Sequence, residues 1–259
     1  MSMNKLFAPL LIACSAVSLS ANAEHVRFEH FDNWHKSAKK HQKKNFNRIA
    51  SFAVCTQIDA SCNTDEETAA EIVAASADGM TLIYSNSPRE TVEFVDITNP
   101  HMPIAAGEIA LPGEPTSVAV AGPYALVGVN TSADFVNASG ELQVINIASR
   151  TVVHTINLGG QPDSVAVSPD GKYAAIVIEN ERDEDLGDGA PPQAPAGFLV
   201  TVKLTGQPTN WAPTQIDLTG IADLYPGDPE PEYVDINKKN IAVVSLQENN
   251  HLILVDLKT

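Results

Sequence analysis

Acidic side chains recur at matching points of a repeated sequence pattern, and they are the residues with the clearest capacity for chemistry. Three of the four copies carry a carboxylate just before the first strand of the copy: Glu71, Asp163 and Glu232. Acids also crowd the stretch ENERDEDLGD at residues 179–188. Carboxylates that converge away from water repel one another, and a hard cation with oxygen ligands, such as Ca²⁺, relieves that repulsion.

Catalytic motifs of other kinds are sparse in the sequence. It contains no G-x-S-x-G elbow, no H-E-x-x-H pair and no glycine-rich phosphate loop. His251 is the histidine nearest to the acidic stretches, beside the sequence QENN, and an ordinary position at the edge of a strand accounts for it. The sequence therefore favours binding over nucleophilic catalysis.

The repeat indicates the elements that position these side chains. Its copies are anchored at Val73, Val118, Val165 and Val234, at intervals of 45, 47 and 69 residues. The copy PDSVAVSPDGKYAAIVIEN (162–180) shows one strand, a Pro-Asp-Gly turn and a second strand, and third strands follow in every copy. Short antiparallel strands with a period in the forties predict an all-β fold, a β-propeller of about four recognisable four-stranded blades. The blades span about 68–112, 113–159, 160–228 and 229–259.

In a blade of this kind, the start of the first strand and the end of the second lie at the same edge. All the acidic segments should therefore share one face of the propeller. The candidate calcium ligands on that face are Glu71, Asp163, Glu179, Glu181, Asp183, Asp185 and Glu232. Candidate ligand-binding residues at the ends of second strands are Asn130, Asn180, Gln247, Glu248 and Asn249. The spacing does not match an EF-hand loop, so a hydrated acidic loop without an ion remains the alternative.

The same strings carry a family resemblance. PDSVAVSPDGKYAAIVIEN resembles the YVTN-type propeller repeat of exported bacterial proteins, and the longer sequences from residue 179 onward are similar to secreted proteins labelled "choice-of-anchor I" or "esterase-like activity of phytase". The resemblance covers roughly residues 46–259 and corresponds to the N-terminal propeller part of longer family members. It implies phosphoester chemistry, with Ca²⁺ held by bridging carboxylates.

Whether four blades close into a ring depends on the outer strand of the fourth blade. The fourth blade lacks an outer strand, and Arg48–Cys55 is a candidate to supply it. Blades shaped for a larger ring would instead have the wrong wedge angle for a ring of four. We therefore predict an open arc from a larger propeller, with apolar end surfaces that are prone to self-association.

The N-terminal sequence predicts export. Residues 1–23 read as a signal peptide that ends in Ala21-Asn22-Ala23, which places the protein in the periplasm or outside the cell. Acylation of Cys14 is a less favoured alternative, and no other apolar run is long enough for a membrane span. In an oxidising compartment, the two remaining cysteines, Cys55 and Cys62, predict a disulfide.

Charge divides the chain into a basic lead-in, residues 24–48, and an acidic body. Without the signal peptide, 15 Lys and Arg face 32 Asp and Glu, a formal charge of −17. Such a body repels nucleic acid and can attract cations. We favour an exported module that binds a ligand, a cation or a protein partner through its acidic face. The alternative is a Ca²⁺-dependent phosphoric ester hydrolase, phytase-like or alkaline phosphatase-like.

Overall fold

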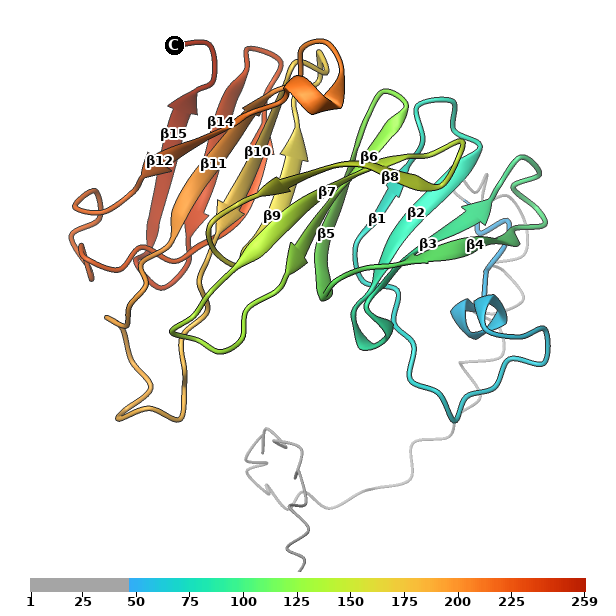
Figure 1. The fold of residues 1–259 in the computed structure, drawn as a ribbon, viewed down its shortest axis with the longest axis horizontal. Coiled ribbons are helices and arrows are strands. Elements are labelled where there is room, and N and C mark those ends of the chain that lie inside the picture. The colour runs from blue at the N-terminus through green and yellow to red at the C-terminus, as the bar shows by residue number, and fades with distance from the viewer. Residues whose placement is uncertain (1–46) are drawn as a thin grey trace, which may run out of the picture. The chain divides into compact units, whose positions relative to one another are not determined.

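The computed structural model describes residues 47–259, and residues 48–259 form one body of four antiparallel sheets (Figure 1). Three sheets have four strands and the last has three, and within each sheet the strands pair in sequence order. The prediction of an all-β propeller with about four blades is confirmed. The predicted signal peptide, Cys14 and nearly all of the basic lead-in lie outside the described residues.

The strand boundaries follow the repeat closely. The first sheet contains β1 (Val73–Ala75), β2 (Thr81–Asn86), β3 (Thr91–Asp96) and β4 (Ile104–Ala110). The second contains β5 (Glu114–Ala121), β6 (Tyr124–Asn130), β7 (Gly140–Asn146) and β8 (Thr151–Asn157). The third contains β9 (Pro162–Val167), β10 (Tyr173–Ile178), β11 (Phe198–Lys203) and β12 (Pro213–Asp217). The fourth contains β13 (Pro231–Ile236), β14 (Ile241–Leu246) and β15 (His251–Asp256).

The turn between β9 and β10 shows how the sequence specifies these hairpins. The hydroxyl of Ser168 accepts hydrogen bonds from the backbone N–H groups of Lys172 and Tyr173, at 3.1 and 3.0 Å, and donates to Asp170 at 2.8 Å. Gly171 takes the positive φ of 69° that the turn requires. The same side-chain arrangement recurs in the first sheet, where Ser76 donates to Asp78. A serine and an aspartate two residues apart therefore fix the turn.

The first strands of the sheets lie side by side along the inside of the arc. The backbone N–H of Val165 in β9 donates to the hydroxyl of Ser117 in β5 at 3.0 Å. One sheet further, the N–H of Val234 in β13 donates to the hydroxyl of Ser164 at 3.4 Å. The first strand of each sheet is therefore the inner strand of its blade.

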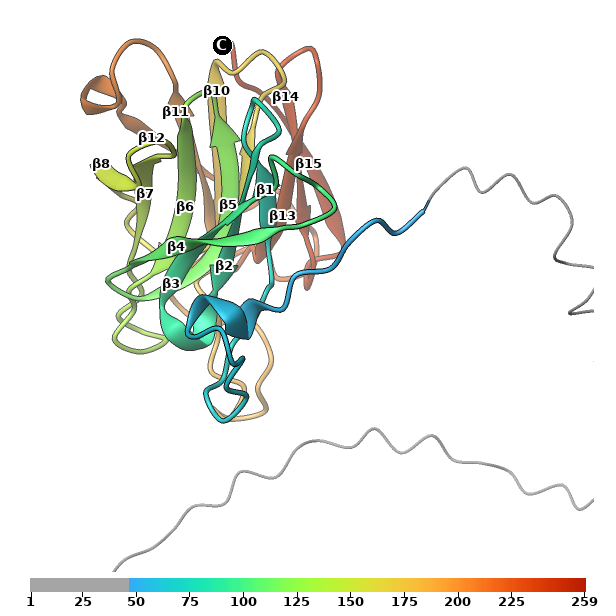
Figure 2. The same ribbon diagram turned by 90° about the vertical axis from the view of Figure 1, so that its right-hand side faces the viewer.

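The core is divided into three layers, one between each pair of neighbouring sheets. Phe94, Leu142 and Leu199, from the third strands of the first three sheets, lie fully buried in successive layers. Figure 2 looks along this stack from the side of the first sheet, with β3 and β4 nearest the viewer. Burial of apolar faces between sheets is the main stabilising term of such a stack.

The prediction of a strand at Arg48–Cys55 is wrong. Within the described residues this segment has no strand, and Val54–Gln57 forms a short 3₁₀ helix that packs near β4 of the first sheet. The disulfide between Cys55 and Cys62 is present, as predicted. The segment adopts a helical turn instead of a strand because the loop between the two cysteines is short. The backbone N–H of Ile58 donates a hydrogen bond to the carbonyl of Cys55. It therefore covers the first sheet and does not complete the fourth.

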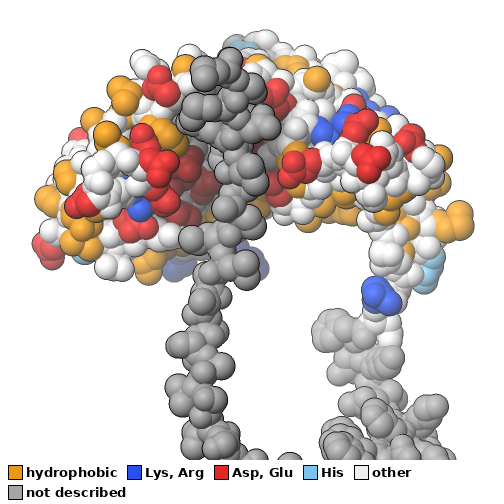
Figure 3. Space-filling model, turned by 90° about the horizontal axis from the view of Figure 1, so that it is seen from below, with side chains coloured by type: hydrophobic (Ala, Val, Ile, Leu, Met, Phe, Trp, Pro, Cys, Tyr) orange, Lys and Arg blue, Asp and Glu red, His pale blue; other side chains and the backbone are white. Residues whose placement is uncertain are grey.

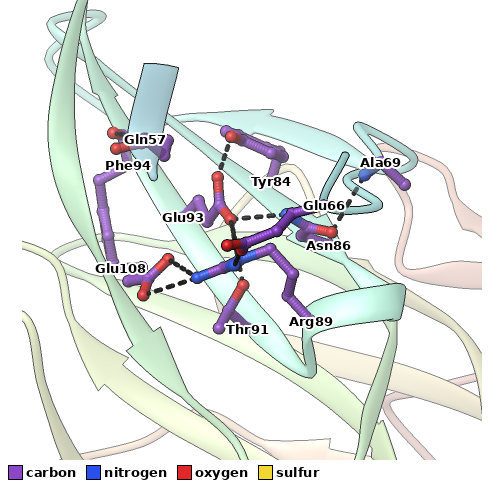
Figure 4. Close-up of polar contacts among 10 residues, drawn as sticks. All are labelled: Gln57, Glu66, Ala69, Tyr84, Asn86, Arg89, Thr91, Glu93, Phe94 and Glu108. Atoms are coloured by element: carbon purple, nitrogen blue, oxygen red, sulfur yellow. Dashed lines mark hydrogen bonds and ion pairs between the residues drawn. The ribbon is translucent and has the colours of Figure 1, made fainter. Parts of the chain in front are cut away.

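Beneath this segment lies a buried polar network on the outer face of the first sheet (Figure 4). Glu93 is fully buried and accepts hydrogen bonds from the Tyr84 hydroxyl, the Asn86 amide at 2.6 Å and the Thr91 hydroxyl at 3.2 Å. Burial, followed by the bond to Glu93, raises the pKa of the Tyr84 hydroxyl.

The covering segment contacts this network directly. The Gln57 amide donates to the carbonyl of Phe94 at 2.6 Å, and Arg89 pairs with both Glu66, at 3.1 Å, and Glu108, at 3.2 Å. We call residues 48–66 the cap. The prediction of apolar surfaces at both ends of the arc is therefore wrong for the first sheet, whose outer face is polar and covered.

We expect Gly197→Ala to destabilise the body by about 2 kcal/mol, because it overpacks the junction between the third and fourth sheets. A Cβ atom at residue 197 would lie 2.5 Å from Cδ of Pro231 and 2.6 Å from the carbonyl oxygens of Ile178 and Pro229. Urea unfolding measures the change. Gly227→Ala is the matched control, since nothing lies within 4 Å of its Cβ position. Equal stability of the two variants would contradict this account of the junction.

Candidate functional site

The starts of first strands and the ends of second strands lie on one face of the body, as predicted. Pro162 pairs with Ile178 in the third sheet, and Glu114 pairs with Asn130 in the second. Figure 3 views this face, on which Asp and Glu side chains gather. We call it the acidic face.

Carboxylates from two neighbouring sheets approach one another at its centre. Burial, followed by the charges of Glu232 and Glu181, raises the pKa of Asp163 to about 6. Burial, followed by the charges of Asp163, Glu232 and Glu181, raises the pKa of Glu179 to about 8. Asp163 is the second residue of β9, Glu179 follows β10 and Glu232 lies in β13, so the contact between the inner strands forces these groups together. We call Asp163, Glu179, Glu181 and Glu232 the central acids.

Two glutamine amides partly offset the repulsion. Gln161 donates to Glu181 at 3.2 Å. With its amide nitrogen turned toward Glu232, Gln247 donates to both carboxylate oxygens, at 3.1 and 3.2 Å. No basic side chain forms an ion pair with any of the central acids among the described residues. The site thus keeps an excess of negative charge.

The other predicted calcium ligands lie apart from this centre. Glu71 belongs to the first sheet and accepts a hydrogen bond from the Ser87 hydroxyl. Asp183 and Asp185 lie in the long loop between β10 and β11, where Asp183 accepts from the backbone N–H of Asp185 at 3.0 Å. Within residues 47–259, no three His, Cys, Asp or Glu side chains are grouped so that they could hold one metal ion. The calcium site remains a prediction.

The predicted amide ligands bind the chain's own backbone. Asn180 and Asn249 are buried, and each side-chain oxygen accepts the N–H of a residue that precedes a first strand, Gln161 or Glu230, at 2.9 Å. Asn130 accepts the N–H of Ser132 at 2.9 Å. These asparagines position the loops of the acidic face.

Sequence reasoning missed an ionic group beside the central acids. Arg182 pairs with the buried carboxylate of Glu230 and, at 3.5 Å, with Glu248. Its Nε also donates to the carbonyl of Gly189 at 2.9 Å within the same long loop, and the pairs with Glu230 and Glu248 tie this loop to the fourth sheet. Burial raises the pKa of Glu230, and Arg182 opposes that shift. The single arginine within the acidic run ENERDED was the available signal.

A groove opens between the β6–β7 loop and the β10–β11 loop on the acidic face. It has a volume of about 490 Å³, and its lining includes the carboxylates of Asp134, Glu181 and Asp183 beside the apolar side chains of Phe135 and Leu186. A smaller hollow of about 220 Å³ adjoins it and shares Asp134, Phe135 and Glu181. The groove therefore runs up to the central acids.

The comparison with protein families agrees with this architecture. The model of the choice-of-anchor I domain matches residues 71–259. The chain belongs to the choice-of-anchor I family. No curated protein matches the sequence. The resemblance read from the repeats is thus confirmed for choice-of-anchor I, whereas its phytase and calcium implications remain predictions.

Two solved structures resemble this choice-of-anchor I chain in fold. Hydrazine synthase of Kuenenia stuttgartiensis is 15% identical, with a TM-score of 0.41, over 73% of this chain and 65% of that one. The β-propeller domain of Cps50 (Swd1) from Myceliophteria thermophila is 12% identical, with a TM-score of 0.48, over 76% of this chain and 57% of that one. The chain spans less than two thirds of either structure.

From residue 47 to residue 259, no helix is long and apolar enough to cross a bilayer.

We expect Glu179→Gln to stabilise the protein in a pH-dependent way. Between about pH 4.5 and pH 8 the folded chain keeps a proton on Glu179 that the unfolded chain releases, so the wild type loses stability as pH rises through this window. The glutamine of the variant does not ionise, so the variant does not lose stability in this pH window. Each unit of raised pKa corresponds to about 1.4 kcal/mol, but Glu179 is only partly buried and solvent screens part of the repulsion, so we expect a gain on the order of 2 kcal/mol at pH 8.5 and little gain at pH 5.

Urea unfolding at both pH values measures this effect. Glu184→Gln is the control, since Glu184 is an exposed acid of the same loop. A gain from Glu179→Gln that is equal at pH 5 and pH 8.5, or no larger than that of the control, would show that Glu179 is not held in a repulsive site.

Proposed function

We propose that this chain is a secreted propeller module that binds a basic segment of a partner protein on its acidic face. The groove between the β6–β7 and β10–β11 loops is the observation that carries the proposal. It combines carboxylates with exposed apolar side chains: Phe135 is 41% exposed and Leu186 is 59% exposed. Lysine and arginine side chains have an apolar stem and a charged head, and they match such a lining.

Electrostatics favours the same class of ligand. Arg182 lines the groove but is neutralised by Glu230 and Glu248, so it does not repel a cation. The central acids beside the groove lack ion-pair partners among the described residues. A positive group bound there would relieve their repulsion and lower the raised pKa values of Asp163 and Glu179. Binding should therefore strengthen as pH rises from about 5 to 8.

A binding role also fits the lack of a catalytic pair in the described part of the chain. No Ser, Thr or Cys side chain there hydrogen-bonds to a histidine, and His251 contacts the carbonyl of Asn249 at 3.3 Å. Such a pair is the usual means of activating a hydroxyl or thiol nucleophile. Export is supported by the family match and by the disulfide, because disulfides persist in oxidising compartments.

Titration with a short fluorescent peptide of alternating lysine and leucine tests the proposal. We expect saturable binding, weakened about tenfold by Glu181→Gln/Asp183→Asn, because both carboxylates line the groove. Asp96→Asn/Asp256→Asn is the matched control. These acids are the last residues of β3 and β15, at the ends of the strands that point away from the acidic face. Equal affinity for a glutamate–leucine peptide, or equal loss in the control, would contradict the proposal.

Added Ca²⁺ separates this proposal from the phosphoesterase alternative. A module without catalysis should not hydrolyse a chromogenic phosphomonoester, whether Ca²⁺ is present or absent. Robust Ca²⁺-dependent turnover by folded protein would overturn the binding role in favour of the hydrolase.

A further inference from the structure

A hollow of about 410 Å³ lies between the first and second sheets, on the side of the body opposite the acidic face. The turns that follow β1, β5 and β7 line it, and these strands run from the acidic face toward the opposite side. Its lining includes one carboxylate, that of Asp78, and one guanidinium, that of Arg150. We call this hollow the turn pocket, and it shares no residue with the groove of the acidic face.

Arg150 reaches from the second sheet over the first. Its guanidinium carbon lies 5.7 Å from the centre of the Phe94 ring, which is a cation–π contact. Its backbone N–H donates to the carbonyl of Asn146 at 2.8 Å and fixes the turn after β7. Among the described residues, no carboxylate forms an ion pair with Arg150. The ring thus holds the guanidinium in place while its charge lacks a counterion in this part of the chain.

Asp78 is fixed by the serine–aspartate turn between β1 and β2. Its Oδ1 accepts hydrogen bonds from the Ser76 hydroxyl at 2.5 Å and from the backbone N–H of Met80 at 3.0 Å. These bonds, that from Ser76 first, lower the pKa of Asp78, so the group is ionised at neutral pH. Both bonds fall on Oδ1, which leaves Oδ2 available to a ligand.

Two opposite charges therefore face one pocket without pairing with each other. The hairpin turn holds Asp78 and the Phe94 ring holds Arg150, so neither side chain can move to the other without giving up its own contacts. A ligand that carries both charges can satisfy both groups at once. Much of the remaining lining is apolar and includes Pro123, Ile147 and Ala148.

The charge balance of the pocket selects against a simple anion. Hydrogen bonds from Thr98, followed by the charge of Arg150, lower the pKa of Asp96, so a second carboxylate also lies within reach of this guanidinium. Asp78 and Asp96 together outweigh the single positive charge, and an anion such as phosphate would be repelled. A zwitterion has no net charge and avoids this repulsion.

We propose that the turn pocket binds a free α-amino acid with an apolar side chain. The carboxylate of the ligand accepts hydrogen bonds from the guanidinium of Arg150, and its ammonium donates to Oδ2 of Asp78. The side chain of the ligand packs against Pro123 and Ile147. This site is separate from the acidic face and does not depend on the function proposed for that face.

Titration of the protein with L-leucine, followed by NMR chemical shifts, tests the proposal. We expect saturable shifts at the amides of Ala77, Gly122 and Ala148, with a dissociation constant of about 1 mM. Two analogues isolate the charges, because N-acetyl-L-leucine lacks the ammonium and isoamylamine lacks the carboxylate. Each analogue should bind about tenfold more weakly, since a charge-assisted hydrogen bond is lost. Arg150→Gln should weaken the binding of L-leucine by about the same factor.

Asp78→Asn should also weaken binding about tenfold, and Asp170→Asn is its matched control. Asp170 forms the same serine–aspartate turn in the third sheet and does not line the turn pocket. The control should leave the affinity for L-leucine unchanged.

Three results overturn the proposal: no saturable shift at the turn pocket up to about 20 mM L-leucine, equal affinity for either analogue, or unchanged affinity in Arg150→Gln. The comparison of L-leucine with its analogues uses the wild-type protein, so it decides the matter even where a variant fails to fold.

Discussion

Face-to-face packing of apolar sheets is the interaction on which the rest of this structure depends. Each inner sheet presents one layer of side chains to the sheet before it and another to the sheet after it, and the two layers alternate along every strand. Close approach at the junctions requires residues without side chains, as at Gly197 beside Pro231. The stack therefore fixes the distance between inner strands, and with it the position of every residue at their ends.

This constraint also explains the electrostatics of the acidic face. Asp163 and Glu232 lie on neighbouring inner strands, and Glu179 follows the strand paired with β9, so the packing holds the three carboxylates close whatever their charge. The raised pKa values of Asp163 and Glu179 record the cost of that placement. Under the proposed function, a basic side chain bound in the neighbouring groove would relieve this repulsion.

The repeat made most of the fold predictable, because strand alternation and the serine–aspartate turns are local signals. The sharing of one face by Asp163, Glu179 and Glu232 also followed from strand polarity alone. Two features could not be predicted from the sequence. The segment from Arg48 to Cys55 has the composition of a strand, but a short disulfide loop bends it into the cap. Asn180 and Asn249 looked like surface ligands, yet tertiary contacts with distant backbone N–H groups bury them.

Carbon-detected NMR titration of the Glu179 side chain is the most direct test of the claim that sheet packing forces the central acids together. The account predicts an apparent pKa near 8 in the free protein, and a decrease when the same protein is titrated with the basic peptide. A carboxyl that titrates near 4.5 in the free protein, with no change on adding the peptide, would contradict it.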